Sequence, residues 1–192
     1  MTGLIILAAG ASTRLDRPKQ LLKFKDETLI SRSINAGINA GCDPIIVVLG
    51  AHSDQIKSEI SNKKVQAILN PHWEEGIGSS IRTGISAMQK HEAPVDNTII
   101  MLCDQPMVDA TLLCRLITKE KKTEKGMVAC AYNDTIGVPV LYQQDYFSEL
   151  LRLSGDEGAK KLLYQHREEV ATIPFPGGAI DIDTNSDVRS YL

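Results

Sequence analysis

The chain has 192 residues, of which 43% are hydrophobic and 23% are charged, and its net charge is −3. This length suits one globular domain, and the absence of a basic stretch argues against general nucleic-acid binding. No apolar run approaches the ~18 residues that cross a bilayer and no basic leader precedes the first strand, so we expect no membrane partner, no signal peptide and a cytoplasmic location.

The first 125 residues alternate between strand and helix patterns. Apolar or β-branched runs predict strands over 4–7, 44–50, 65–69 and 98–103. Helical spacing or capping residues predict helices over 27–40, from 53 or 54 to about 61, over about 80–89 and after Asp109. This alternation is typical of a doubly wound, mostly parallel sheet.

Strands lie closer together from Met127 onward. The patterns predict strands over 127–131, 138–142, 170–173 and 179–182. They predict helices over 146–153, 158–166 and from 185 or 186 to 191. This second part therefore predicts a mixed sheet with an antiparallel edge, within an α/β fold.

The four cysteines are widely spaced and form no C-x-x-C pair: Cys42, Cys103, Cys114 and Cys130. Each lies beside apolar residues, which favours reduced core thiols over disulfides or zinc ligands. The histidines show no metal-ligand spacing, and no Ser/His/Asp grouping is visible. A reaction whose nucleophile is already an anionic phosphate needs no such grouping.

Three loops with chemically useful residues each follow a predicted strand: 8–19, 70–80 and 104–106. In doubly wound sheets ligands bind outside the carboxyl ends of the strands, so we expect these loops to meet at one site. Small residues in the first loop would let a ligand approach the backbone closely. No Walker A or G-x-G-x-x-G motif occurs, which disfavours a nicotinamide-dependent reductase.

Several charged side chains in these loops have two readings each. Arg14 and Lys19 either neutralise a polyphosphate or are solvated surface cations. Asp104 either holds Mg²⁺ at the end of its strand or caps a turn before Pro106. Asp181 and Asp183 each offer a second carboxylate, unless this region only caps the last helix.

Two serines at the start of the fourth predicted helix are also ambiguous. Ser79 and Ser80 either donate to a phosphate or ribose, aided by the helix N-terminus, or simply cap the helix.

The residues in these loops resemble motifs of the small nucleotidyltransferases of the molybdenum-cofactor group, especially the molybdenum-cofactor cytidylyltransferases. The family pattern resembles L-A-A-G-x-S-x-R-M-G-x-x-K-x-L-L, and residues 7–22 read LAAGASTRLDRPKQLL. Further matches follow in order: Asn70-Pro71, Trp73, Gly76, Gly78-Ser79-Ser80, Asp104-Gln105-Pro106, Gly137-x-Pro139, Gly155-Asp156-x-Gly158-Ala159 and Asp181-Ile182-Asp183-Thr184. Leu15-Asp16 and Val138 depart from the family pattern, which has Met-Gly and often His at these positions.

This resemblance implies a GT-A-type nucleotidyltransferase fold, Rossmann-like and three-layered (α/β/α), with a mostly parallel mixed sheet. It implies one domain over 1–192, with a nucleotide-binding half to about residue 125 and an acceptor-binding half over about 126–192. The implied reaction is Mg²⁺-dependent transfer of CMP from CTP to molybdopterin cofactor, with release of pyrophosphate. The implied partner is a molybdenum hydroxylase that receives the cofactor.

The resemblance also implies roles for individual residues. Arg14, Lys19 and Asp104 are the implied catalytic residues; Arg14 and Lys19 hold the triphosphate, and Asp104 and Asp183 hold the metal, with Asp181 less favoured. The remaining nucleotide contacts come from the base-reading backbone and from one of two serines: Leu7, Ala8, Ala9 and Gly10, and Ser79 or Ser80. The Ala-Ala-Gly form favours CTP, because guanylyltransferase relatives tend to carry Gly-Gly.

Two other functions fit the same motifs. In the first, the protein is a cytidylyltransferase whose acceptor is a sugar or polyol phosphate. In the second, the protein binds molybdenum cofactor as a maturation factor and transfers no nucleotide.

Overall fold

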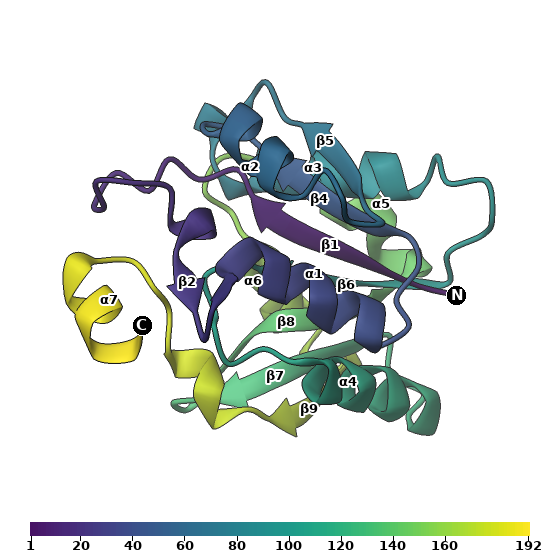
Figure 1. Ribbon diagram of the computed structural model, residues 1–192. Coiled ribbons are helices and arrows are strands. Elements are labelled where there is room, and N and C mark those ends of the chain that lie inside the picture. Colours follow the sequence, from purple (N-terminus) through teal and green to yellow (C-terminus); the bar gives the residue numbers. More distant parts are fainter.

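A seven-stranded sheet crosses the protein, and the computed structural model describes all of residues 1–192 (Figure 1). Its strands are β1 (Thr2–Ala8), β4 (Ile45–Leu49), β5 (Gln66–Leu69), β6 (Asn97–Leu102), β7 (Met127–Tyr132), β8 (Thr135–Gln143) and β9 (Val170–Pro174). They lie in the order β5-β4-β1-β6-β8-β7-β9, and only β8 runs antiparallel to its neighbours. The predicted mostly parallel mixed sheet is confirmed.

Helices cover both faces of the sheet and make the three layers that the sequence predicts. One face carries α1 (Leu29–Asn39), α2 (Ser53–Glu59) and α4 (Ala110–Lys122). The other face carries α3 (Ile77–Met88), α5 (Phe147–Leu150) and α6 (Lys160–Gln165). Each face has its own apolar core, of 24 and 19 buried residues. Every residue of β4 is buried, because a central parallel strand is covered on both sides.

The last helix, α7 (Asn185–Tyr191), lies beside the short hairpin of β2 (Lys23–Phe24) and β3 (Glu27–Thr28) (Figure 1). Val188 of α7 packs against a small apolar cluster that includes Phe24 and Ile182. This contact holds the C-terminal segment against the loop that follows β1.

Four helices begin at other residues than the sequence predicts: α1, α3, α5 and α6. The helix expected from residue 27 begins at Leu29, because Thr28 caps it: the Thr28 Oγ1 accepts from the Ser31 N–H at 3.2 Å. The helix expected from about residue 80 begins at Ile77, directly after Gly76. The backbone of Gly76 has φ 104° and ψ −178°, which side chains other than glycine rarely adopt.

The strand predicted over 179–182 is wrong. Pro176–Ala179 forms a 3-10 turn instead, and the residues after it join no sheet. A proline followed by two glycines favours a tight turn over a strand. The Ile182 N–H nevertheless donates to the Asp104 carbonyl at 3.0 Å, so this segment contacts the end of β6.

The hairpin of β7 and β8 is tighter than the predicted turn-rich link over 133–137. Its turn consists of Asn133 and Asp134, with φ 46° and 55°. Two such residues in the left-handed region make the turn that best matches the twist of a hairpin. Because β7 is parallel to β1 and β6 in the sheet, this turn lies at the same edge as the ends of those strands.

Candidate nucleotide and metal site

One cavity of about 350 Å³ lies at the carboxyl ends of β1 and β6. Seven residues predicted to bind the nucleotide line it: Leu7, Ala8, Ala9, Gly10, Lys19, Ser80 and Asp104. Gln20, Trp73, Ile77 and Asp156 contribute to the remaining wall. Loops far apart in the sequence therefore meet at one sheet edge, which is the arrangement expected of a ligand site in this fold.

The loop after β1 is held in place by internal hydrogen bonds. The buried Gln20 side chain donates to the carbonyls of Ala8 and Gly10, at 3.0 and 3.1 Å. The Lys19 N–H donates to the Ser12 Oγ at 3.0 Å. Sequence reasoning gave Gln20 no role, because its burial becomes visible only once the loop is folded. Gln20 fixes the backbone that faces the cavity.

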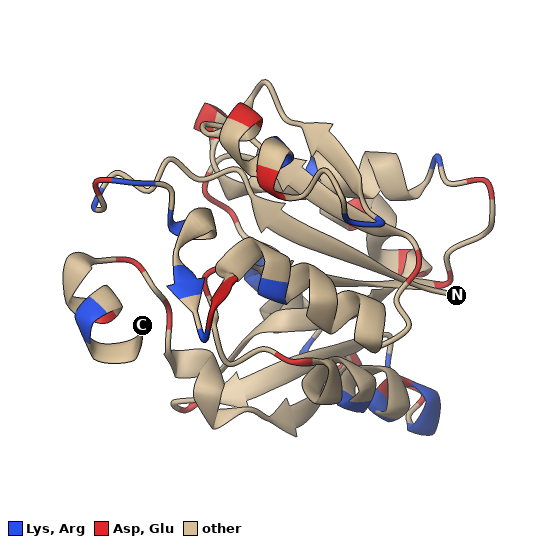
Figure 2. Cartoon of the chain, viewed as in Figure 1, with Lys and Arg blue, Asp and Glu red and all other residues tan.

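Lys19 lies between two carboxylates. Its Nζ donates to the Asp104 Oδ2 at 2.5 Å and to the Asp183 Oδ1 at 2.7 Å. Arg14 donates to the other oxygen of Asp183 at 3.0 Å. In Figure 2, Lys and Arg colour several positions of the loop after β1, and Asp and Glu colour the segment that leads into α7. Arg14 and Asp183 do not line the cavity. Asp183 pairs with Lys19, which does line it, and Arg14 pairs with Asp183.

The charges in this cluster change the pKa values of its members. Burial alone would lower the pKa of Lys19, but the charge of Asp104 and the hydrogen bonds to Asp104 and Asp183 raise it well above its usual range. Burial would raise the pKa of Asp183, but Lys19 and Arg14 lower it below its usual range. Lys19 and Asp183 are therefore both charged at neutral pH.

Asp183 reaches the cluster because its neighbour Ile182 is anchored. Ile182 is fully buried in a small cluster with Leu15 and Phe24. On the other side, the N–H groups of Asp183 and Thr184 both donate to Asp187 at the start of α7, at 3.1 and 2.7 Å. The segment is thus fixed at both ends by packing and capping.

Two other residues of interest lie apart from the ion pairs. Asp181 makes no ion pair and is exposed, and partial desolvation together with the charge of Asp104 raises its pKa to about 6. Asp16, which departs from the family pattern, is exposed, whereas its neighbour Leu15 is buried.

The residues of the cluster fit a divalent cation. Asp104 is 6% exposed, and its Oδ1 is buried with no hydrogen-bond partner. Carboxylate oxygens are the ligands that Mg²⁺ and Mn²⁺ prefer. No group of three or more His, Cys, Asp and Glu side chains comes together to hold a metal. A cation bound by Asp104 and Asp183 would therefore take further oxygen ligands from water or phosphate.

The two serines of α3 have different surroundings. Ser79 donates to the carbonyls of His72 and Gly76, at 2.8 and 2.9 Å, and accepts from Asn70 at 2.9 Å. Ser80 accepts from Asn70 at 3.1 Å and lines the cavity, where its hydroxyl proton remains available. Ser79 stabilises the loop, and Ser80 is the serine that can contact a ligand.

We therefore expect different outcomes from the two alanine variants. Ser80→Ala should raise KM for the nucleotide about tenfold without lowering the melting temperature, because it removes one donor to a charged ligand. Ser79→Ala should leave KM unchanged and lower the stability by about 1–2 kcal/mol, because it leaves buried polar groups unpaired. Steady-state kinetics and thermal unfolding measure both effects. The reverse pattern would contradict the assignment.

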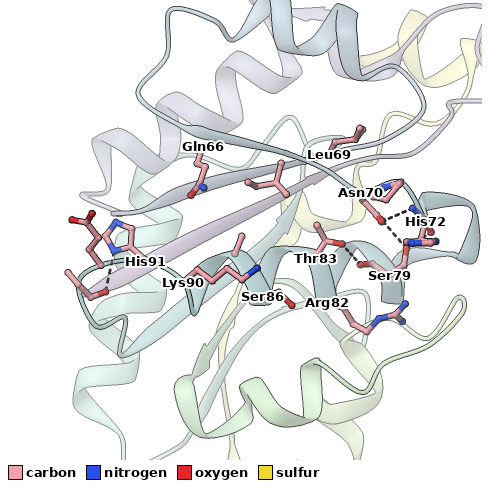
Figure 3. Close-up of a pocket in the computed structure, with 15 residues that line it drawn as sticks. Gln66, Leu69, Asn70, His72, Ser79, Arg82, Thr83, Ser86, Lys90 and His91 are labelled. Atoms are coloured by element: carbon pink, nitrogen blue, oxygen red, sulfur yellow. Dashed lines mark hydrogen bonds between the residues drawn. The ribbon is translucent and has the colours of Figure 1, made fainter.

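A larger groove, of about 750 Å³, lies between β5 and α3 on the other side of the loop over 70–76 (Figure 3). Ser79 is the only predicted site residue that lines it. Figure 3 shows Asn70 bonded to His72 and Ser79, so these polar groups are satisfied within the protein. The groove contains none of the cationic and acidic residues of the cluster around Lys19.

Residues 4–170 match the model of the MobA-like NTP transferase domain. The chain belongs to this family. This MobA-like protein is therefore a nucleotidyltransferase, and the resemblance found in the sequence is confirmed at family level.

Two curated relatives illustrate the range of the family. Nicotine blue oxidoreductase from Paenarthrobacter nicotinovorans is 28% identical over 84% of this chain and 80% of its own length. Molybdenum cofactor cytidylyltransferase from Escherichia coli (strain K12) is 21% identical over 95% of this chain and 91% of its own length.

The fold of this MobA-like protein also matches solved structures. The crystal structure of Rv0371c from Mycobacterium tuberculosis H37Rv superposes with a TM-score of 0.84 and 28% identity, covering 98% of this chain and 96% of that chain. A structure of Rv0371c in complex with manganese matches with a TM-score of 0.81 and 28% identity, covering 100% and 97%. The nucleotidyltransferase fold predicted from the sequence is confirmed.

None of the helices is both long enough and apolar enough to span a membrane.

Proposed function

We propose that this protein transfers CMP from CTP to the terminal phosphate of molybdopterin cofactor and releases pyrophosphate. The observation that carries the proposal is the meeting of three elements at one cavity: the small-residue loop 7–10, the cation Lys19 and the carboxylate Asp104. A cavity of about 350 Å³ lies within the range of small-molecule sites.

The proposed reaction places specific demands on the chain. An acceptor phosphate oxygen forms a bond to the α-phosphorus of CTP, and the bond from that phosphorus to pyrophosphate breaks. Because the acceptor phosphate is already anionic, no side chain has to remove a proton from it. Lys19 and Arg14 stabilise the charge that develops on the leaving pyrophosphate.

Asp104 and Asp183 are the proposed metal ligands, and Mg²⁺ is the proposed physiological ion. When bound, the ion would neutralise phosphate charge that would otherwise repel the acceptor. The manganese complex of Rv0371c, a relative that is 28% identical, supports divalent-metal binding by this chain.

The proposed choice of CTP rests on the backbone of Ala8, Ala9 and Gly10, which lines the cavity. Backbone N–H and C=O groups can read the edge of a base only where side chains are small. The relative named molybdenum cofactor cytidylyltransferase supports both CTP and the acceptor.

We place the acceptor over the second half of the chain, residues 126–192. A second cavity, of about 500 Å³, lies beside the β7–β8 hairpin and is lined by Tyr132, Tyr164 and Arg167. Aromatic faces and a cation are suitable partners for a flat, anionic molecule such as a pterin phosphate. In this proposal the product passes to a molybdenum hydroxylase in the cytoplasm.

The test measures pyrophosphate release from each of the four NTPs, with Mg²⁺ or Mn²⁺, in the presence of molybdenum cofactor or a sugar 1-phosphate. We expect release only with CTP and molybdenum cofactor. Pyrophosphate release with the sugar phosphate would show that the acceptor is a sugar phosphate instead of molybdenum cofactor. Tight binding of molybdenum cofactor without pyrophosphate release would support the function of a maturation factor. Oxidation of NAD(P)H is measured in parallel, because one relative is named an oxidoreductase.

A further inference from the structure

The ammonium group of Lys19 lies where a divalent cation would bind. It contacts one oxygen of Asp104 and one oxygen of Asp183, at 2.5 and 2.7 Å. A divalent cation shared by two carboxylates lies about 2.0–2.6 Å from an oxygen of each. Lys19 and a metal therefore cannot occupy this position together.

Few carboxylate oxygens remain for a metal in this arrangement. Arg14 occupies the second oxygen of Asp183, at 3.0 Å. The second oxygen of Asp104 has no partner, but it is buried. A cation that approaches the protein in this state finds one uncommitted oxygen, and Lys19 repels it at close range.

Lys19 can reach a second set of ligands without any change in the backbone. The backbone N–H of Lys19 is fixed by its hydrogen bond to Ser12, and Lys19 is the first residue of the 3-10 turn Lys19–Leu21. Its side chain has four rotatable bonds and also lines the nucleotide cavity beside Gly10. A triphosphate in this cavity would offer the ammonium group of Lys19 more negative charge than the two carboxylates do.

Lys19 cannot leave without a replacement. Its side chain is 17% exposed and that of Asp104 is 9% exposed, so withdrawal would leave the buried carboxylate of Asp104 without a counter-charge, while Asp183 would keep only Arg14. Such unpaired buried charges are strongly unfavourable. Lys19 can therefore leave its position between Asp104 and Asp183 favourably only when a metal ion takes that position.

We propose that Lys19 is an exchangeable counter-cation of the metal site: it neutralises Asp104 and Asp183 in the free protein and moves to the triphosphate when nucleotide binds. This inference rests on the proposed function for the identity of the nucleotide. Metal and nucleotide then each increase the affinity for the other, by the same factor.

Binding of Mn²⁺ alone, followed by electron paramagnetic resonance, tests the exchange. We expect Lys19→Met to bind Mn²⁺ about tenfold more tightly than the wild-type protein without nucleotide. Lys19→Arg keeps the positive charge and should bind as weakly as the wild type. Lys23→Met, which removes an exposed lysine four residues away, should have no effect. Circular dichroism checks that each variant is folded.

A Lys19→Met variant that binds Mn²⁺ no more tightly than the wild type would overturn the proposal. Adding Asp104→Asn to Lys19→Met should abolish the gain. The α,β-methylene analogue of CTP is titrated separately into the wild type. Failure of that analogue to bind would refute the proposed nucleotide, while the Mn²⁺ comparison would still decide whether Lys19 occupies the cation position.

Discussion

Asp104→Asn should lower kcat/KM for nucleotidyl transfer by about 10³-fold, which corresponds to about 4 kcal/mol of transition-state stabilisation. The change keeps the shape of the side chain and removes the charge that holds Lys19 at 2.5 Å and that we propose binds a cation. The loss should appear with both Mg²⁺ and Mn²⁺. Initial rates of pyrophosphate release at several CTP concentrations measure it.

Two aspartates of the C-terminal segment serve as matched variants for this prediction. Asp183→Asn should cause a loss of similar size, because Asp183 shares Lys19 with Asp104. Asp181→Asn should change the rate less than about threefold, since Asp181 makes no ion pair. An Asp181 variant as inactive as the Asp104 variant would sink the assignment of the metal ligands. All three variants should keep the circular dichroism spectrum of the wild type.

Gly76→Ala should destabilise the protein by about 3 kcal/mol and lower its melting temperature by roughly 6–12 °C. The φ of Gly76 is 104°, and an added Cβ would lie 2.5 Å from the carbonyl oxygen of Gly155 and from the Asp156 side chain. The backbone of Gly78 donates to that same carbonyl at 3.0 Å, so displacement of the loop would also remove this hydrogen bond. Differential scanning calorimetry measures the loss.

Gly158→Ala is the matched control, in the loop over 155–158 that Gly76 contacts. Its φ is not positive, and an added Cβ would meet only Ile77, at 3.8 Å. The expected change is below about 0.5 kcal/mol. Equal destabilisation by the two variants would show that the loop as a whole, rather than the backbone of Gly76, is sensitive. Because Asp156 lines the cavity that we propose binds CTP, Gly76→Ala should also raise KM for that nucleotide.

The sheet could be predicted from the sequence because its strands carry strong local patterns. The run over 44–50 is continuously apolar, as a strand covered on both faces must be, and all of Ile45–Leu49 is buried. The position of the loops also follows from the pattern, since each loop comes directly after such a strand. Their convergence at one cavity is a consequence of parallel topology.

The parts that the sequence did not predict depend on contacts between distant residues. The expected strand over 179–182 fails because Ile182 is buried by packing against Leu15 and by bonding to Asp104, with no neighbouring strand to pair with. The start of α3 was predicted three residues too late because the hydroxyl groups of Ser79 and Ser80 suggested a cap. The cap position belongs to Gly76, and its unusual φ cannot be read from composition.

The ion pair between Arg14 and Asp183 joins residues 169 positions apart. The matched family region ends at residue 170, so one of the two carboxylates around Lys19 lies beyond it. During synthesis the loop after β1 is made well before Asp183. The complete cluster of Arg14, Lys19, Asp104 and Asp183 therefore cannot form on a ribosome-bound chain until residue 183 has emerged. A protein cut after residue 170 would retain Lys19 and Asp104 but would lack Asp183, one of the two carboxylates of the cluster.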